Sequence, residues 1–169
     1  MIKFIVGIIV GICLVLVAAY LFVTQGGIQM GVRGGPTTGE HFLASHAIRA
    51  SMGNSAQDKS PLPADDTNLL AGADVYMHHG CAGCHGQLDK PDSGMGSRFY
   101  PHAPHLLAPP RGGGHAPVGA THWVVKNGLR FSGMPTFEDK LTDDQIWQVS
   151  LLLENVGKLP PAVQDALRK

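Results

Sequence analysis

The sequence predicts an all-α protein with long loops, placed behind one N-terminal transmembrane helix. The first observation is an uncharged apolar run from Phe4 to Val23. The second is that apolar residues elsewhere recur at helical spacing, whereas no run alternates with period two for long enough to form a strand. The third is the content of 22 glycines and 12 prolines among 169 residues, which indicates that much of the chain is loop. A large core of protein side chains is therefore not expected to organise the fold.

Composition and charge argue against several classes of protein. Thirteen Lys and Arg residues balance thirteen Asp and Glu residues, so the formal net charge is zero. A dedicated nucleic-acid binder usually presents a strongly basic face, and this chain has no such excess. Three cysteines are too few for a disulfide scaffold.

The apolar run at the N-terminus is long enough to cross a membrane. A helix of its length spans about 30 Å, the thickness of the hydrocarbon layer. A cleaved signal peptide is the alternative, because Lys3 supplies a short basic segment before the run. The run exceeds the roughly 7–15 apolar residues of a signal peptide, no A-x-A-like site follows it, and Ile12 before Cys13 does not suit a lipoprotein signal. We therefore expect an uncleaved anchor over residues 1–24, with its N-terminus in the cytoplasm because Lys3 is the only charge before the span.

The next segment is expected to be a flexible tether followed by a short helix. Residues 25–39 hold six glycines and a proline, which is typical of a linker with an r.m.s. reach of about 20 Å. The stretch from Glu40 to Met52 predicts a helix, whose expected apolar face comprises Phe42, Leu43, Ala47 and Ile48. Residues 53–66 are polar and contain proline, so they predict a loop.

Two later helices carry clear start and stop signals. Asp66 or Thr67 is the expected N-cap of the first, and Gly80 is expected to end it. Its apolar residues at helical spacing are Leu69, Leu70, Ala73, Tyr76 and Met77. The second is expected from Thr142 to Val156, with capping-box spacing between Thr142 and Gln145 and with Gly157 after its end. Its expected apolar face is Ile146, Val149, Leu153 and Val156.

Between these helices lies a long segment without periodicity. Residues 86–119 are rich in glycine and proline, and a loop of this length in a compact domain normally needs a function or a ligand to order it. A short helix is expected from Thr121 to Asn127, closed by Gly128. Pro160 and Pro161 are expected to open a final helical tail.

The motif Cys81-Ala82-Gly83-Cys84-His85 directly follows the first of the two helices. Two thiols separated by two residues can each form a thioether bond with a haem vinyl group, and the adjacent histidine then becomes an axial ligand of the iron. A redox disulfide would need a βαβ setting, which the sequence lacks, and a zinc site would need further ligands that only spare histidines could supply. The motif therefore predicts one haem c bound covalently through Cys81 and Cys84, with His85 as a metal ligand. Haem would also act as the core around which the irregular segment packs.

With this motif, the chain resembles a membrane-anchored monohaem class I c-type cytochrome over the range Thr67–Val156. The other residues that carry the resemblance are Gly72, Tyr76, Ala103-Pro104-His105-Leu106, Asn127-Gly128, Phe131-Ser132-Gly133-Met134-Pro135 and Trp147. The resemblance implies the class I cytochrome c fold, in which short helices and long loops pack around covalent haem. It also implies that the carbonyl group of Pro104 accepts the ring N–H of His85, and that Gly72 and Tyr76 meet the C-terminal helix. The chain departs from the family pattern at Ala103, His105 and Leu152, and its loop between His85 and Pro104 is longer than usual.

Met134 is the expected sixth iron ligand, because it precedes a proline in a Gly-flanked loop before the terminal helix. Met95, in a second Gly-rich loop, is an alternative. Met77 suits a core position, and Met30 and Met52 lie in the N-terminal region. The remaining alternatives for this ligand are His78, His79, His102, His105, His115 and His122.

Other polar residues near the motif have two interpretations each. Arg98 and Arg130 could pair with the haem propionates, since guanidinium matches a carboxylate, or could be solvated charges. Trp123 is expected to pack in a helical core rather than to donate to a propionate. Asp143 and Asp144 are expected to oppose the macrodipole at a helix N-terminus.

An iron with histidine and methionine ligands has no open position, so the predicted function is electron transfer rather than catalysis. The alternatives are a peroxidase-like haem enzyme and a gas-sensing module, and both need a displaceable sixth ligand.

Expected partners are membrane lipid along residues 4–23 and the redox proteins of a respiratory or photosynthetic complex, which the chain would serve as carrier or subunit. Because haem is attached on the outer side of the bacterial inner membrane, the haem domain is expected on the periplasmic or outer side of that membrane. The expected organisation is an anchor (1–24), a linker (25–39), an N-terminal extension (40–66), a cytochrome c domain (67–157) and a C-terminal tail (158–169).

Overall fold

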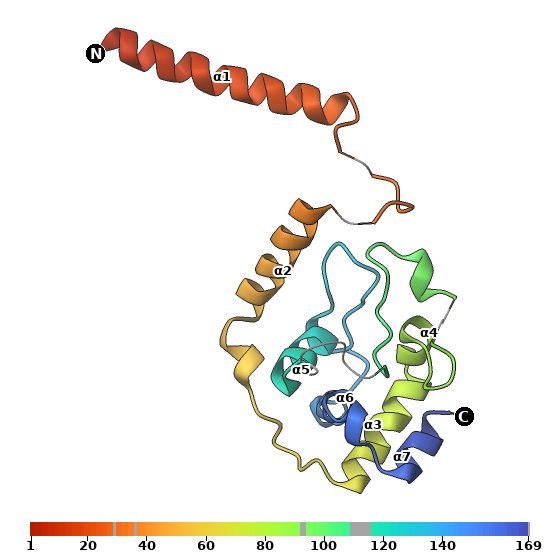
Figure 1. The fold of residues 1–169 in the computed structure, drawn as a ribbon. Helices are drawn as coiled ribbons and strands as arrows, with labels where there is room; N and C mark the ends of the chain where they lie inside the picture. Colours follow the sequence, from red (N-terminus) through yellow and green to blue (C-terminus); the bar gives the residue numbers. More distant parts are fainter. Residues whose placement is uncertain (29, 36, 92–93, 109–115, 169) are drawn as a thin grey trace. The chain divides into compact units, whose positions relative to one another are not determined.

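The computed structural model describes residues 1–28, 30–35, 37–91, 94–108 and 116–168. The chain divides into two compact units, Met1–Gly34 and Gly35–Lys169. All regular elements of the described residues are helices, which confirms the all-α class (Figure 1). His115, one of the histidines considered as an iron ligand, lies outside the described residues.

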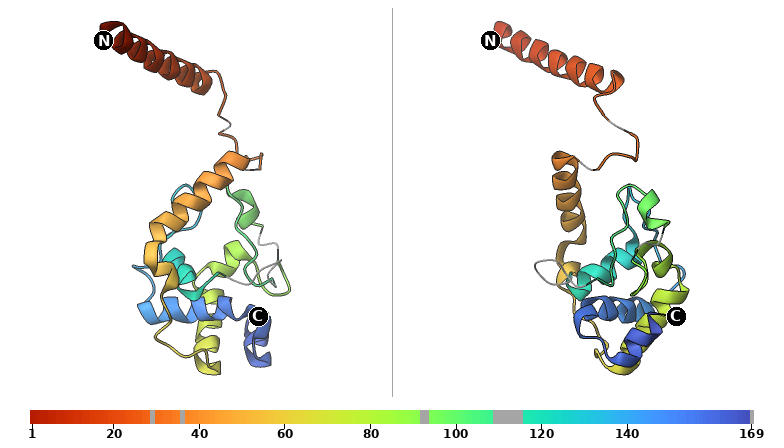
Figure 2. Two further views of the ribbon diagram at one scale, coloured as in Figure 1. Left: turned by 60° about the vertical axis from the view of Figure 1, so that its left-hand side comes forward. Right: turned by 45° about the vertical axis from the view of Figure 1, so that its right-hand side comes forward.

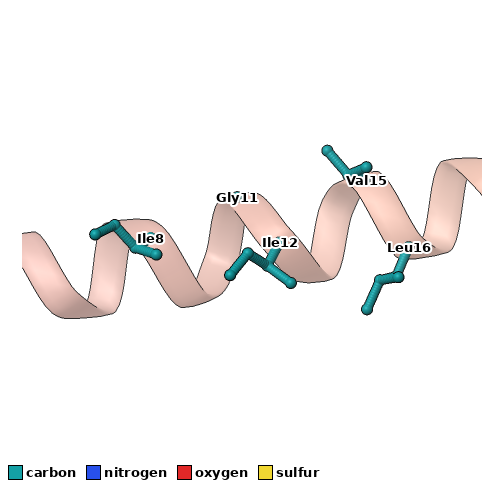
Figure 3. A pocket seen from close by; sticks show the side chains of 5 residues that line it. All are labelled: Ile8, Gly11, Ile12, Val15 and Leu16. Carbon is teal, nitrogen blue, oxygen red and sulfur yellow. The ribbon is translucent and has the colours of Figure 1, made fainter.

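Helix α1 (Ile2–Thr24) covers the apolar run and extends it slightly at both ends. It is uncharged apart from Lys3, its mean hydropathy is 2.9, and none of its residues is buried. Figure 3 shows the apolar side chains of Ile8, Ile12, Val15 and Leu16 projecting from the helix on either side of Gly11. Length and composition therefore fit a single-pass membrane anchor.

Helix α2 (Thr38–Met52) begins two residues before the expected start at Glu40. The reason is a capping box that the expected start left out: the Thr37 hydroxyl accepts from the backbone N–H of Glu40, and the Glu40 carboxylate accepts from the backbone N–H of Thr37. The predicted apolar face is wrong as a packing face, because Phe42 and Leu43 are 58% and 69% exposed. The half-buried side of the helix carries Ser45, Ile48 and Met52. A short 3₁₀ helix, η1 (Gly53–Gln57), occupies part of the predicted loop.

Helix α3 (Asp66–His78) is capped by Asp65, whose carboxylate accepts from the backbone N–H of Asn68 at 2.9 Å. The expected cap at Asp66 or Thr67 was wrong by one or two positions, since an N-cap side chain must reach a free N–H two or three residues ahead. The helix ends at His78, and Gly80 adopts φ 96° to turn the chain into helix α4 (Cys81–His85). The Cys81–His85 motif is therefore a single helical turn.

The long irregular segment contains one described 3₁₀ turn, η2 (Gly96–Arg98). Helix α5 (Val118–Asn127) starts three residues before the expected Thr121, with Pro117 as its N-cap. Pro117 lacks an N–H and has a fixed φ, so it suits the start of a helix. Gly128 closes α5 with φ 69°, as predicted.

Helix α6 (Asp143–Glu154) begins with the predicted capping box between Thr142 and Gln145. It ends at Glu154 rather than at Val156, where the last turn tightens: the backbone N–H of Asn155 is shared between the carbonyl groups of Leu151 and Leu152, and the Asn155 side chain donates to Leu151 as well. A 3₁₀ turn, η3 (Val156–Lys158), follows, and the predicted tail helix is α7 (Pro161–Ala166).

Helices α3 and α6 pack against each other and supply much of the buried core (Figure 2). Their close approach depends on Gly72, where a Cβ atom would collide with the carbonyl group of Gln148. Helix α5 packs on α6, and α7 packs on α3. The largest fully buried side chains are Tyr76, Leu107, Ile146, Val149, Ser150, Leu152, Val163 and Leu167. This core holds α4 and the loop that carries Met134 at its edge, because Cys81 belongs to the core and Met134 packs against it.

Candidate haem site

The turn α4 is held at both ends by helix α3. The left-handed backbone at Gly80 joins the two helices without an intervening loop. The buried hydroxyl of Tyr76 donates to the carbonyl group of Gly86 at 2.8 Å, and burial raises the pKa of Tyr76, so this hydroxyl stays protonated at all physiological pH values. The position of the motif is thus set by the same helix that packs on α6.

Both cysteines of the motif are thiols, and neither forms a disulfide bond. Cys81 is 9% exposed and belongs to the apolar core, whereas Cys84 is half-buried. Burial raises the pKa of Cys81 to about 11, so its sulfur is a protonated thiol at neutral pH. Two cysteine sulfurs in one helical turn at the edge of the core suit the formation of two thioether bonds.

His85 is oriented by a residue 19 positions away in the sequence. Its Nδ1 atom lies 2.7 Å from the carbonyl oxygen of Pro104. A carbonyl oxygen can only accept, so Nδ1 carries the proton and the lone pair is on Nε2. Burial lowers the pKa of His85, against the opposing effect of the Pro104 hydrogen bond, and so favours the neutral ring. A neutral imidazole with a free Nε2 is the form that binds a metal ion, and its N–H partner fixes the ring orientation.

The loop that carries Met134 is ordered by its own hydrogen bonds. The Ser132 hydroxyl donates to the carbonyl group of Leu129 at 2.8 Å and accepts from the N–H of Met134 at 3.1 Å. The N–H of Leu129 donates in turn to the carbonyl group of Met134 at 3.1 Å. Phe131, at the tip, is the one described non-glycine residue with a positive φ (60°), and its side chain is 92% exposed. The Met134 side chain is half-buried and packs against the edge of the core.

This loop also contacts the segment that orients His85. At Gly133 a Cβ atom would lie 2.7 Å from the ring of Phe99. Phe99 and Pro104 belong to the same described segment, residues 94–108, so the candidate ligands His85 and Met134 are held by segments that pack on each other. The donor set of Cys81, Cys84, His85 and Met134 therefore fits a covalent haem c.

The other methionines are placed less favourably for an iron ligand. Met95 is 56% exposed and Met30 is 86% exposed. Met77 packs against the core from helix α3, and Met52 is half-buried at the end of α2. Of the methionines considered, Met134 combines partial burial, contact with the core and a hydrogen-bonded loop.

Three of the candidate histidines already have polar partners. His78 lies 3.0 Å from the carboxylate of Asp74, and Nε2 of His105 lies 3.1 Å from the carbonyl oxygen of Gln87. Nε2 of His122 lies 3.1 Å from the carboxylate of Asp143. The side chains of His79 and His102 are exposed. Within the described ranges, no group of three or more His, Cys, Asp or Glu side chains is arranged to hold a metal ion, which counts against the zinc alternative there.

The two arginines considered as propionate partners are exposed. Neither Arg98 nor Arg130 forms a side-chain hydrogen bond or ion pair with another residue in the described part of the chain. Arg98 and Arg130 therefore remain candidate partners of the haem propionates only because of their positions in the sequence. Trp123 is half-buried on α5, between the two interpretations given to it.

Asp143 was expected to be a simple helix-end charge, but the structure gives it three partners. Its carboxylate accepts from the indole N–H of Trp147 at 3.0 Å and lies 3.1 Å from His122 and 3.2 Å from Nζ of Lys126. The rings of His122 and Trp147 are stacked, with centroids 3.8 Å apart. Burial raises the pKa of Asp143, but Lys126 and His122 outweigh it and lower the pKa overall. The contact between Asp143 and Trp147 could have been predicted from the sequence, because the two residues are four positions apart on one helix. The contacts with His122 and Lys126 could not, because those residues lie on another helix, α5.

Comparisons with known proteins place the chain in a family. No curated protein matches it. A chain of a reducing HAO-like protein complex from Kuenenia stuttgartiensis has a similar structure, with 19% sequence identity and a TM-score of 0.48. The match covers 71% of this chain and 61% of that one, so it spans less than two thirds of that chain's length. The family model described as cytochrome c oxidase, cbb3-type, subunit III matches residues 67–151, just over half of the chain. This range contains the Cys81–His85 motif, Pro104 and Met134, and the chain therefore belongs to that family of class I c-type cytochromes.

Proposed function

We propose that the protein transfers electrons through a single haem c, attached by thioether bonds to Cys81 and Cys84 and ligated by His85 and Met134. The observation that carries the proposal is the 2.7 Å contact between Nδ1 of His85 and the carbonyl oxygen of Pro104. It leaves Nε2 of a neutral ring as the binding atom, at the end of a turn that also holds the two thiols. Membership of a c-type cytochrome family implies covalent haem c and supports haem-based electron transfer.

Each protein group has a distinct task in this proposal. When bound, the haem iron supplies one-electron chemistry by changing between its ferrous and ferric states. Pro104 keeps the proton on Nδ1 of His85, so the histidine presents the same atom in both states. Met134 offers a soft, neutral sulfur, which favours the ferrous state. The hydrogen bonds of Ser132 order the loop that would hold that sulfur at the iron, and a haem bound in this way would offer no open position to a substrate.

The anchor helix supports attachment of the protein to a membrane. We propose that α1 spans the inner membrane once and that the haem domain lies in the periplasm, where haem is attached to c-type cytochromes. The family description names a subunit of a cbb3-type oxidase, which supports a fixed subunit of a respiratory complex over a free carrier. Its partners would then be the electron donor and acceptor of that complex.

The test uses the full chain purified from its native membrane. A pyridine haemochrome assay after acid–acetone extraction should give one haem per chain, and the proteins that co-purify should include other oxidase subunits. The reduced protein should bind little carbon monoxide at neutral pH, because both axial positions are filled. Stoichiometric carbon monoxide binding would instead favour the haem enzyme or the gas sensor.

A further inference from the structure

Helix α2 has an outward face that is mainly apolar, with one histidine and no Asp, Glu, Lys or Arg, and its side chains are exposed. Phe42, Leu43, His46, Ala47 and Ala50 are all exposed, and they share one side of the helix. The two large members, Phe42 and Leu43, are 58% and 69% exposed. The only other ring on this face, His46, lies against Phe42 with centroids 4.1 Å apart. We call these five residues the α2 stripe.

The opposite side of α2 is the one fixed to the domain. Ser45, Ile48 and Met52 are half-buried there, and the helix contacts η1. At its N-terminal end, the carboxylate of Glu40 accepts from the hydroxyl of Tyr100 at 3.2 Å. The α2 stripe is therefore presented outward by a helix whose other side and cap are held, rather than by a loose segment.

The segment before α2 indicates what could cover the α2 stripe. Residues 25–36 join the end of the membrane span at Thr24 to the cap Thr37, and a flexible coil of this length has an r.m.s. end-to-end distance of about 20 Å. Residues 25–39 contain one charge, Arg33, and no acidic residue. Their apolar side chains Ile28, Met30 and Val32 are 47%, 86% and 53% exposed. This linker therefore offers one basic charge to an anionic lipid surface. The acidic group that precedes the α2 stripe, the Glu40 carboxylate, accepts hydrogen bonds from the Thr37 N–H and the Tyr100 hydroxyl.

We propose that α2 lies in the plane of the membrane surface, with the α2 stripe in the interface between the lipid headgroups and the acyl chains. The inference rests on the anchoring by α1 proposed above. A surface helix with one charge-free apolar face suits this position, and tethering makes a weak lipid affinity sufficient because the local concentration of membrane is high. Contact through α2 would limit the free linker to residues 25–37. It would also give the haem domain one preferred orientation towards the membrane.

Because α1 keeps every variant on the membrane, the test must measure depth rather than binding. The full-chain holoprotein is placed in nanodiscs of phosphatidylethanolamine and phosphatidylglycerol and labelled with a nitroxide at one cysteine. One label is placed at the native Cys13, in the membrane span. A second is placed at position 42, in the Cys13→Ala/Phe42→Cys variant. A third is placed at position 144, in the Cys13→Ala/Asp144→Cys variant, because Asp144 is exposed at the start of α6. Accessibility to oxygen, which dissolves in lipid, is compared with accessibility to a water-soluble nickel chelate. An unchanged haem spectrum and helix content show that each variant is folded.

The expected result is an oxygen-to-nickel accessibility ratio at position 42 that exceeds the ratio at position 144 several-fold and approaches the ratio at Cys13. A ratio at position 42 equal to that at position 144, with a lipid-like ratio at Cys13, would overturn the inference while the anchor stands. Water-like ratios at both Cys13 and position 42 would overturn the anchor and the inference together. Low accessibility to both reagents at position 42 would overturn the inference, because it would show that a protein covers the α2 stripe. If that accessibility rose on dilution to one chain per nanodisc, the covering protein would be a second copy of this chain; if it stayed low, the covering protein would be another subunit.

Discussion

A Cβ atom at Gly72 would collide with the backbone carbonyl group of Gln148, so helices α3 and α6 approach each other as closely as a glycine allows. Tyr76, one turn further along α3, is fully buried. This crossing sets the position of α4 and so of the Cys81–His85 motif. The site is therefore sensitive to a contact made several residues before its first cysteine.

Gly72→Ala should destabilise the protein, because the added methyl group meets backbone that cannot move aside. Overpacking of this kind costs about 1–3 kcal/mol of the free energy of unfolding. Guanidinium unfolding followed by circular dichroism measures the loss. Gly157→Ala is the matched control, since a Cβ atom at that position would meet nothing within 4 Å, and it should change stability by less than about 0.5 kcal/mol. Equal effects at the two positions would contradict the close packing of α3 on α6.

The double variant Cys81→Ala/Cys84→Ala should lose covalent haem, because both thioether bonds disappear. Acid–acetone extraction should remove all haem from the variant and none from the native protein, as measured by the absorbance of the protein pellet. Cys13→Ala is the control, since Cys13 lies in α1, outside the haem domain. Haem that stays in the pellet of the double variant would disprove c-type attachment.

Met134→Ala should lower the reduction potential, remove the sulfur-to-ferric-iron charge-transfer band and allow carbon monoxide to bind. The reason is that a thioether stabilises ferrous iron, and axial ligands shift haem potentials over a range of about 0.8 V. Met134→His should keep six ligands but also lower the potential. Redox titration and absorption spectra measure these effects. Met95→Ala, at a methionine that is 56% exposed, should leave all three nearly unchanged; the reverse pattern would make Met95 the ligand.

His122 should make the protein less stable in mild acid. Burial lowers the pKa of His122 in the folded protein below its ordinary value of 6.5, although Asp143 acts in the opposite direction. The unfolded chain then binds the proton more readily than the folded one, so stability present above about pH 6.5 is lost as the pH falls through this range. His122→Phe, which can keep the stacking on Trp147, should reduce the difference in unfolding midpoint between pH 7 and pH 5. His79→Phe, at an exposed position, should not; an undiminished difference in His122→Phe would assign the acid sensitivity to other groups.

A chain that begins at Gly35, secreted behind a cleavable signal, should fold as a water-soluble haem domain. Gly35 is the first residue of the second compact unit, and this start keeps the Thr37–Glu40 capping box. Size-exclusion chromatography without detergent and a reducible haem spectrum are the measurements. A chain that begins at Glu40 should also take up haem, but loss of the Thr37 cap should weaken α2 by about 1 kcal/mol. Aggregation of both forms, or failure to take up haem, would show that residues before Gly35 belong to the folded domain.

Local patterns in the sequence were enough to predict the helices and the chemistry of the Cys81–His85 motif. The span of α1, the capping box at Thr142 and the turn at Gly128 depend on residues a few positions apart, and the two thiols of the motif lie in one turn of helix. Such features follow from helical spacing and from the conformations that glycine and proline allow. Helix ends were less predictable, as at Asp65 and Glu154, because the capping contacts that decide them compete within one or two residues.

Contacts between distant segments were decided only by the tertiary structure. Phe42 and Leu43 stay exposed although their spacing suggested a packing face, because the side of α2 that is half-buried is the one that carries Ser45, Ile48 and Met52. Asp143 gathers His122 and Lys126 from another helix, a pairing with no local signal. Helical periodicity tells which residues share a face but not which face is buried, since burial depends on what the rest of the chain brings to that side. The sequence by itself therefore determined the helices and the attachment chemistry, whereas tertiary packing decided which side chains surround them.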